Sequence, residues 1–282
     1  MSDVVIPVIL GIWGLLILYP FYNSIVVSLV PQATYIRTPF LLYPKDFTLN
    51  AYSYVFHSPT IWNGYKVTIA ITVLGLAYNM ILSVSMSYAL SRRRWPGKTL
   101  LLNIIIFTMF FQGGLIPFYL LVRGLGLINS IFSMILPYGV NTFYMLIMRN
   151  YFRGIPDSIE ESAKIDGAND LTILARIIVP LSMPVIATVS LFFIVDRWNE
   201  WFFGLLFIRS VLKQPLQLVL RNIIMTVSAM DAAGIPAPIQ QAAFPDGIKM
   251  AAIAVTMLPV MVVYPFIQKY FTKGIILGAI KS

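Results

Sequence analysis

The chain has 282 residues, of which 59% are hydrophobic and only 11% are charged, whereas a soluble domain carries about 25% charged residues. This balance excludes an ordinary soluble fold and predicts an integral membrane protein with short loops. The formal net charge of +9 comes largely from basic residues beside apolar segments, so it does not call for a nucleic-acid partner. The chain contains no cysteine, which excludes disulfides, iron–sulfur clusters and thiol catalysis.

Six apolar stretches are long enough to cross a membrane as α-helices, because a bilayer requires about 20 residues per span. The sequence therefore predicts an all-α polytopic fold in one transmembrane domain, residues 1–282. Its spans are expected at about 4–29, 64–91, 99–121, 129–148, 182–208 and 248–268. Gln112, Gly113, Gly114 and Pro117 interrupt the third of them. The segments 30–60 and 209–246 are expected to be external loops, and 150–181 a loop on the opposite side.

The distribution of basic residues predicts the orientation. Segments 92–98, 149–176 and 269–281 together hold eleven Lys and Arg residues, against seven in the opposite loops. Loops rich in Lys and Arg stay in the cytoplasm. We therefore expect a multi-pass protein of the cell membrane with both termini in the cytoplasm.

The polar segment 150–181 has helix signals of its own. Pro156 suits a helix entrance, where its missing N–H has no effect. Asp157 with Glu160, and Ser158 with Glu161, have the spacing of a capping box. One face of this helix is predicted to carry Ile159, Ser162, Ala163 and Asp166.

A second short helix is predicted to follow a tight turn. Gly167 stands where the first helix ends, because glycine adopts a left-handed conformation without a Cβ clash. Asn169 or Asp170 can cap the second helix. Its apolar side is predicted to carry Leu171, Leu174, Ile177 and Ile178. Pro180 marks the join to the fifth span.

These residues carry a resemblance to a known family. The sequence Glu-Ser-Ala-x-x-Asp-Gly-Ala at 161–168, with Pro180 downstream, resembles the EAA loop of permease subunits of bacterial ABC importers. Ser162 replaces the usual first alanine of that motif. Further segments resemble the carbohydrate-uptake branch, and most of all permeases for oligosaccharides of plant or algal polysaccharides; they lie at 113–130, 198–202, 215–223 and 264–282.

The resemblance implies the permease fold of type I ABC importers, in which a cytoplasmic coupling helix inserts into a separate ATPase subunit. The implied coupling residues are Pro156, Glu160, Glu161, Ser162, Ala163, Asp166, Gly167, Ala168 and Pro180. It also implies a second, homologous permease subunit, two ABC ATPase subunits that bind ATP and Mg, and an extracellular solute-binding protein. The substrate would be an oligosaccharide, and acidic oligosaccharides are among the candidates.

Three ionisable residues, Asp196, Arg197 and Glu200, fall within the fifth span. Each would cost about 2.5–3.5 kcal/mol at the centre of a membrane, so they are expected to pair or to face a polar cavity. One interpretation is a sugar pathway in which Trp201 stacks on a pyranose ring and Arg197 holds a carboxylate. The other is a structural ion pair between Arg197 and Glu200, three residues apart.

Other polar and aromatic side chains at membrane depth are further candidates for the pathway. With those of the fifth span, the set is Gln112, Tyr119, Tyr138, Asn141, Tyr144, Arg197, Asn199, Glu200 and Trp201. For each residue, helix–helix hydrogen bonding or interfacial anchoring is the alternative. The external segment 209–246 either faces the solute-binding protein or is a solvated connector.

The sequence offers no catalytic centre. Residues 95–99 end like a phosphate-binding loop, but the position that requires its first glycine is Arg92. ATP hydrolysis is therefore expected from another polypeptide, with no cofactor in this chain. The single histidine, His57, cannot form a multi-histidine metal site. An ion-coupled secondary transporter using Asp196, Arg197 and Glu200, or a polytopic membrane enzyme, stays open as an alternative.

Overall fold

The computed structural model describes residues 2–38, 41–92, 97–111, 113–233, 244–259 and 261–262. Within these residues every regular element is helical and none is a strand, as the sequence predicts. The chain divides into two compact units. The first unit joins Met1–Tyr65 to Pro215–Val262, and the second joins Lys66–Gln214 to Val263–Ser282.

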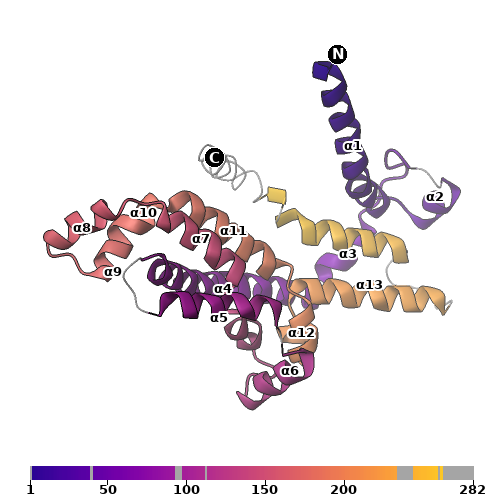
Figure 1. Cartoon of the computed structure of the whole chain (residues 1–282). Coiled ribbons are helices and arrows are strands. Elements are labelled where there is room, and N and C mark those ends of the chain that lie inside the picture. Colours follow the sequence, from indigo (N-terminus) through magenta and orange to yellow (C-terminus); the bar gives the residue numbers. More distant parts are fainter. Residues whose placement is uncertain are drawn as a thin grey trace. The chain divides into compact units, whose positions relative to one another are not determined.

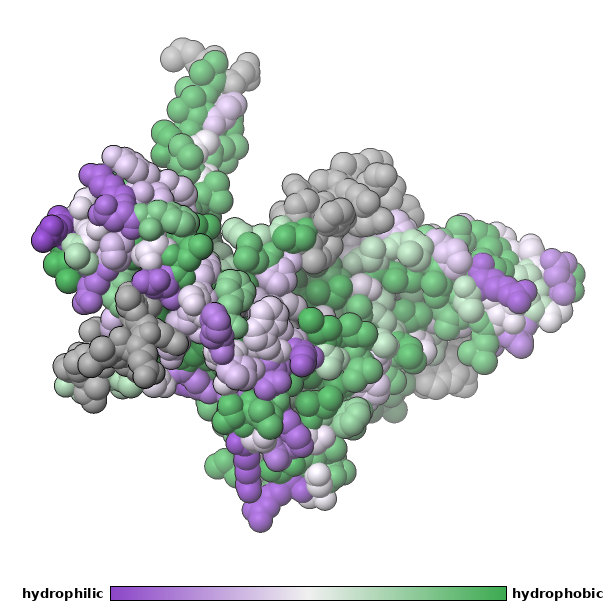
Figure 2. All heavy atoms as spheres, turned by 180° about the vertical axis from the view of Figure 1, so that it is seen from behind, coloured by the Kyte–Doolittle hydropathy of each residue, from purple (hydrophilic) through white to green (hydrophobic). Residues whose placement is uncertain are grey.

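In the first unit, helix α1 (Ser2–Ser28) is apolar on all sides. Its membrane-length segment Val4–Ser28 buries none of its most apolar stretch, and the face seen in Figure 2 is almost entirely hydrophobic. A helix that is hydrophobic all round requires an apolar environment around it. By length and composition α1 matches the predicted first span.

The predicted external loops contain helices. Segment 30–60 includes α2 (Gln32–Arg37) and α3 (Asn50–His57), and the C-terminal part of the unit contains α13 (Leu216–Ala232) and a helix over 245–259. The predicted external segment 209–246 thus contains the helix α13, which the sequence did not predict. Polar residues before and after it hide the helical spacing of Leu216, Val219, Ile223 and Val227. Residues 234–243 of that loop lie outside the described residues.

The second unit is built on the continuous helix α4 (Pro59–Ser91), which begins in the first unit and matches the second predicted span (Figure 1). The third predicted span consists of α5 (Lys98–Phe110) and α6 (Leu115–Gly124). They are separated at Gly113 and Gly114, as the sequence predicts, and Gly114 has a φ of +86°. Glycine reaches that conformation without strain.

The fourth predicted span is not one helix. Two 3-10 segments, η1 (Ile131–Met134) and η2 (Leu136–Tyr138), precede α7 (Thr142–Arg153) at an angle of 46°. Pro137 in η2 has no N–H for a continuous helix. The side chain of Asn141 then accepts hydrogen bonds from Phe143 N and Tyr144 N, which caps α7.

The fifth predicted span is divided at 199–201 into α11 (Met183–Trp198) and α12 (Phe202–Phe207), followed by η4 (Val211–Lys213). Between α7 and α11 lie the short elements α8 (Asp157–Ile165), α9 (Asp170–Ile173), η3 (Leu174–Ile178) and α10 (Val179–Leu181). Figure 1 shows them gathered at one end of this unit. Their inner side chains join α7 and α11 in one core that includes Met148, Phe152, Ala163, Ile173, Ile178 and Val189.

Among the described residues two helices are long and apolar enough to cross a membrane, or up to five if each of three bent helix pairs is one span. The predicted sixth span, 248–268, extends beyond the described residues. The count of six therefore stays a prediction.

Candidate functional site

Helix α8 begins at Asp157, with Pro156 at its N-cap. Proline has no side-chain acceptor, so no side-chain cap is formed, and the predicted capping boxes are wrong. Asp157 and Ser158 instead lie inside the first turn. Asp157 and Glu160 still place negative charge at the helix N-terminus, where the helix dipole favours it.

The buried face of α8 consists of Glu160 and Ala163. Of the residues predicted to share one face, Ala163 is buried, whereas Ile159, Ser162 and Asp166 are exposed. The face that packs inward also carries the carboxylate of Glu160, which the predicted face did not include. Glu161, the first residue of the motif, lies on the exposed side.

The turn after α8 confirms the predicted role of Gly167. Its φ is +82°, its N–H donates to Lys164 O at 3.1 Å, and Ala168 N donates to Ala163 O at 3.0 Å. These two bonds form a Schellman motif, which closes a helix around a left-handed glycine. Asn169 then accepts a hydrogen bond from Thr172 N at 2.8 Å and caps α9, one of the two caps that the sequence allowed.

The second helix continues α9 into a π-helical segment, η3. Ile173 and Ile178 are both buried although they are five residues apart, which is the spacing of a π-helix. Leu171 is predicted on the same side as Ile178, but Leu171 is 77% exposed and Ile178 is buried. The predicted face assumed α-helical periodicity throughout. Pro180 lies at the exposed surface of α10, where the chain turns toward α11.

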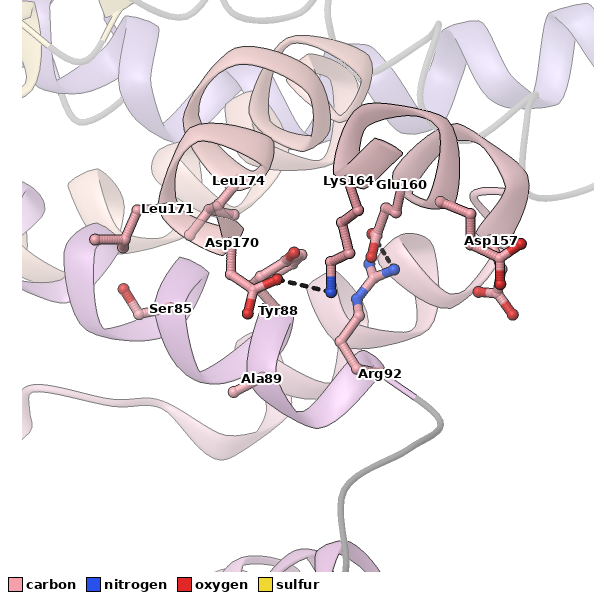
Figure 3. Close-up of a pocket in the computed structure, with 11 residues that line it drawn as sticks. Ser85, Tyr88, Ala89, Arg92, Asp157, Glu160, Lys164, Asp170, Leu171 and Leu174 are labelled. Carbon is pink, nitrogen blue, oxygen red and sulfur yellow. Dashed lines mark ion pairs between the residues drawn. The ribbon is translucent and has the colours of Figure 1, made fainter. Parts of the chain in front are cut away.

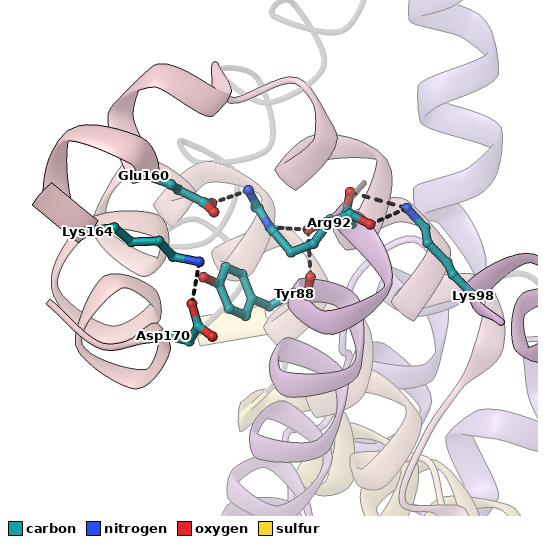
Figure 4. Close-up of polar contacts among 7 residues, drawn as sticks. Tyr88, Arg92, Lys98, Glu160, Lys164 and Asp170 are labelled. Atoms are coloured by element: carbon teal, nitrogen blue, oxygen red, sulfur yellow. Dashed lines mark hydrogen bonds and ion pairs between the residues drawn. The ribbon is translucent and has the colours of Figure 1, made fainter. Parts of the chain in front are cut away.

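Arg92, directly after α4, fixes α8 to the rest of the unit (Figure 4). Its guanidinium forms an ion pair with Glu160 and lies 4.7 Å from the ring centroid of Tyr88. Its Nε donates to Ser91 Oγ at 3.0 Å, and its carbonyl accepts from Lys98 Nζ at 2.7 Å. The sequence predicts Arg92 as part of a basic segment and gives no sign of this ion pair, since nothing local reveals a partner 68 residues away.

An open pocket of about 730 Å³ lies between the end of α4 and the elements α8, α9 and η3. In Figure 3, Arg92 and Glu160 point toward one another across it, and Lys164 and Asp170 form a second, exposed ion pair at 2.9 Å. Burial raises the pKa of the Glu160 carboxyl above its usual value, and the nearby Arg92 opposes this shift. The remaining lining residues are Ser85, Tyr88, Ala89, Asp157, Glu161, Leu171 and Leu174.

A second pocket of about 250 Å³ lies where α11 ends. Its lining brings together Tyr138, Asn141, Arg197 and Glu200 of the predicted pathway set, with Val140, Phe193, Asp196 and Phe203. Tyr144, also predicted, donates a hydrogen bond to Asp196 at 3.0 Å. The sequence thus selected residues from three elements that meet in the fold.

Arg197 is only 5% exposed, and its donors go to protein acceptors. Nε and one terminal nitrogen donate to Asn79 Oδ1 at 3.2 and 3.0 Å, and further bonds reach the carbonyls of Met134 and Tyr138. Gly75 of α4 makes room for this side chain, because a Cβ there would lie 3.0 Å from Nε. Asn79 was not predicted as a partner, because it is one of several polar residues in the second span.

The second interpretation of the fifth span was an ion pair between Arg197 and Glu200. The ion pairs among the described residues do not include this one. Glu200 lies beyond the end of α11 and accepts a hydrogen bond from Phe203 N at 2.8 Å, near the start of α12. The helix break removes the three-residue helical spacing that would bring the two side chains together. Arg197 therefore acts as a hydrogen-bonding hub, and Glu200 supports the first turn of α12.

The other predicted pathway residues lie outside this pocket. Tyr119 stacks on Phe207 with ring centroids 6.0 Å apart. Asn199 and Trp201 are exposed, and the Asn199 side chain donates to Val195 O at 2.9 Å. Gln112 lies outside the described residues.

These features define a helical membrane protein with a polar helix–turn–helix between two apolar segments. The family model described as "Binding-protein-dependent transport system inner membrane component" matches residues 79–277, and the chain belongs to this family. It is a permease subunit of an ABC importer and is not itself catalytic. Membership sets aside the ion-coupled carrier and the membrane enzyme.

Two relatives from Bacillus subtilis (strain 168) are each 42% identical and match 99% of this chain. They are protein LplC, matched over 95% of its length, and the polygalacturonan/rhamnogalacturonan transport system permease protein YtcP, matched over 98%. A chain in a crystal structure of a bacterial ABC transporter involved in import of the acidic polysaccharide alginate has a TM-score of 0.88 and 36% identity. That match covers 95% of this chain and 96% of the other.

Proposed function

We propose that this chain is one of two transmembrane subunits of an ABC importer that brings acidic oligosaccharides into the cell. The substrate class is supported by the two named similarities, one to a permease for polygalacturonan and rhamnogalacturonan and one to an alginate importer. Both polymers consist partly or wholly of uronic acids. The second permease, the two ATPase subunits with ATP and Mg, and the solute-binding protein would be separate chains.

The observation that carries the coupling part of this proposal is the geometry of α8, Gly167 and α9. Two large aliphatic side chains, Ile165 and Leu171, flank the turn and are 87% and 77% exposed. The charged residues Glu161, Lys164 and Asp166 of the same segment are exposed as well, so the segment does not suit the membrane interior. An exposed apolar pair on a rigid, capped turn suits insertion into a cleft of the ATPase.

Co-purification tests this docking. The transporter is expressed from its operon, and the ATPase that is retained with the tagged chain is quantified for wild type, Glu161→Lys and Leu171→Asp. Wild type should retain the ATPase and both variants should lose most of it. Asp246→Lys, a charge reversal at a half-buried aspartate of the first unit, is the matched control and should retain it. Failure of wild type to retain an ATPase in several detergents would overturn the docking proposal.

The pocket at the end of α11 is the proposed place of sugar contact in this chain. Tyr138 and Phe203 offer aromatic faces, and Asn141, Asp196 and Glu200 offer hydrogen-bonding groups. Because the Arg197 donors reach protein acceptors, we assign the guanidinium to holding the pocket together. Proteoliposomes of the complete transporter should take up labelled oligogalacturonate in an ATP-dependent manner. Equal uptake of a neutral oligosaccharide of the same length would contradict the acidic assignment.

The membrane arrangement belongs to the same proposal. Six spans would place both termini and the α8–α9 loop in the cytoplasm, and the distribution of Lys and Arg supports this orientation. Because the chain has no native cysteine, single introduced cysteines can test it. A cysteine at Ser158 should react with impermeant maleimide only from the cytoplasmic side.

A further inference from the structure

The Arg92–Glu160 ion pair is the only described ion pair whose carboxylate is largely buried: Glu160 is 7% exposed, whereas the Lys164–Asp170 and Lys249–Asp246 pairs lie nearer solvent. It links the end of the long helix α4 to the inner face of α8. The inner face of α8 carries two buried residues, Glu160 and Ala163. Glu160 forms the ion pair, and Ala163 adds apolar packing beside it.

The surroundings of the pair hold it in one geometry. Arg92 is constrained by the Tyr88 ring beneath its guanidinium, by Ser91 Oγ at its Nε, and by Lys98 at its carbonyl. Its side chain therefore has little freedom to follow Glu160 if α8 moves by itself. Tyr88 belongs to the same core as Ala163, Ile173 and Ile178, so the pair and the apolar packing resist the same displacement.

We infer that Arg92 and Glu160 are positioning residues that make α8 move with α4, so that a displacement at the ATPase is transmitted to the spans. The inference rests on the proposed docking of α8 to an ATPase. It separates the two adjacent glutamates: Glu161 lies on the outward side of α8, and Glu160 ties the helix to its own subunit. Loss of the pair would leave docking in place and uncouple it from the spans.

The test uses the complete transporter in proteoliposomes and compares Arg92→Glu, Glu160→Arg and the double exchange, with Asp170→Asn as the control that breaks the exposed pair. Each reversal should still retain the ATPase but lose about tenfold in the stimulation of ATP hydrolysis by loaded binding protein, within the range of coupling between distant sites. The double exchange should recover most of the stimulation. Asp170→Asn should resemble wild type.

A distance measurement separates positioning from general misfolding. Spin labels at Ala89→Cys on α4 and Ser158→Cys on α8 should give a narrow distance distribution in wild type. Either reversal should broaden it, and the double exchange should narrow it again. An unchanged distribution in both reversals, or no recovery of stimulation in the double exchange, would overturn the inference. If the wild-type chain retains no ATPase, the proposed function is contradicted. The spin-label distances then decide whether Arg92 and Glu160 position α8 relative to α4.

Discussion

Replacing Arg197 with methionine tests whether this side chain holds the fold or the sugar. The substitution keeps a long apolar stem and removes four hydrogen bonds that reach three acceptors, Asn79 Oδ1 and the carbonyls of Met134 and Tyr138. The Tyr138 carbonyl still accepts a hydrogen bond from Asn79 Nδ2, so two buried acceptors, Asn79 Oδ1 and the Met134 carbonyl, lose their Arg197 donors. Each such loss costs about 1–3 kcal/mol, so the expected loss of stability is about 2–5 kcal/mol.

The assay is thermal unfolding of the purified transporter in detergent, followed by the loss of monodisperse protein in size-exclusion chromatography. Arg197→Met should lower the midpoint by roughly 10 °C. Arg197→Lys keeps the positive charge but loses the planar guanidinium, so its unfolding midpoint should lie between those of Arg197→Met and wild type. Asp196→Asn, the exposed neighbour, is the control and should change stability by about 1 kcal/mol or less.

One outcome would refute the reasoning. If Arg197→Met melts at the wild-type temperature and selectively loses uptake of uronate oligosaccharides, the guanidinium acts on the substrate and its hydrogen bonds to the protein are incidental. A parallel loss of stability and of uptake for all sugars is the expected pattern for a hub.

Three further substitutions address the helix–turn–helix. Gly167→Ala should destabilise the loop by about 1–2 kcal/mol because φ is +82°, with Gly124→Ala, at an ordinary φ, as the control; accelerated limited proteolysis would report it. Asn169→Ala should remove the cap of α9 and cost about 1 kcal/mol, visible as faster hydrogen exchange at the Thr172 amide. Ala163→Leu should overpack the inner face of α8 by about 1–3 kcal/mol and weaken ATPase retention, whereas the exposed Lys164→Leu should not; equal retention by both variants would contradict this packing.

The sequence was most informative where a local rule decides the structure. The turn at Gly167 and the cap at Asn169 depend on neighbours within five residues, and both were predicted. Helices α1 and α4 followed from apolar length alone. Arg92 with Glu160, and Arg197 with Asn79, join residues 68 and 118 positions apart, and no periodicity in one chain reveals such partners.

Mixed composition hides two further features. Segment 209–246 is predicted as an external segment because of its polar residues, and no helix was predicted within it, although α13 buries Leu216 and Leu218 there. The buried carboxylate of Glu160 was not predicted either, because a carboxylate is rarely buried unless it is paired and its partner Arg92 is distant in the sequence. In both places tertiary packing overrode the average character of the sequence.

The π-helical segment η3 determines the angular register between the loop and α11. A π turn holds one more residue than an α turn, so it corresponds to a single inserted residue between Ile173 and Ile178. Deleting one residue there would leave an ordinary α turn with the two flanking segments in nearly the same orientation. Deleting one residue of the α-helical α9 would instead turn everything on the loop side by about 100°, and Glu160 would then face away from Arg92. A single deletion should therefore be better tolerated in η3 than in α9.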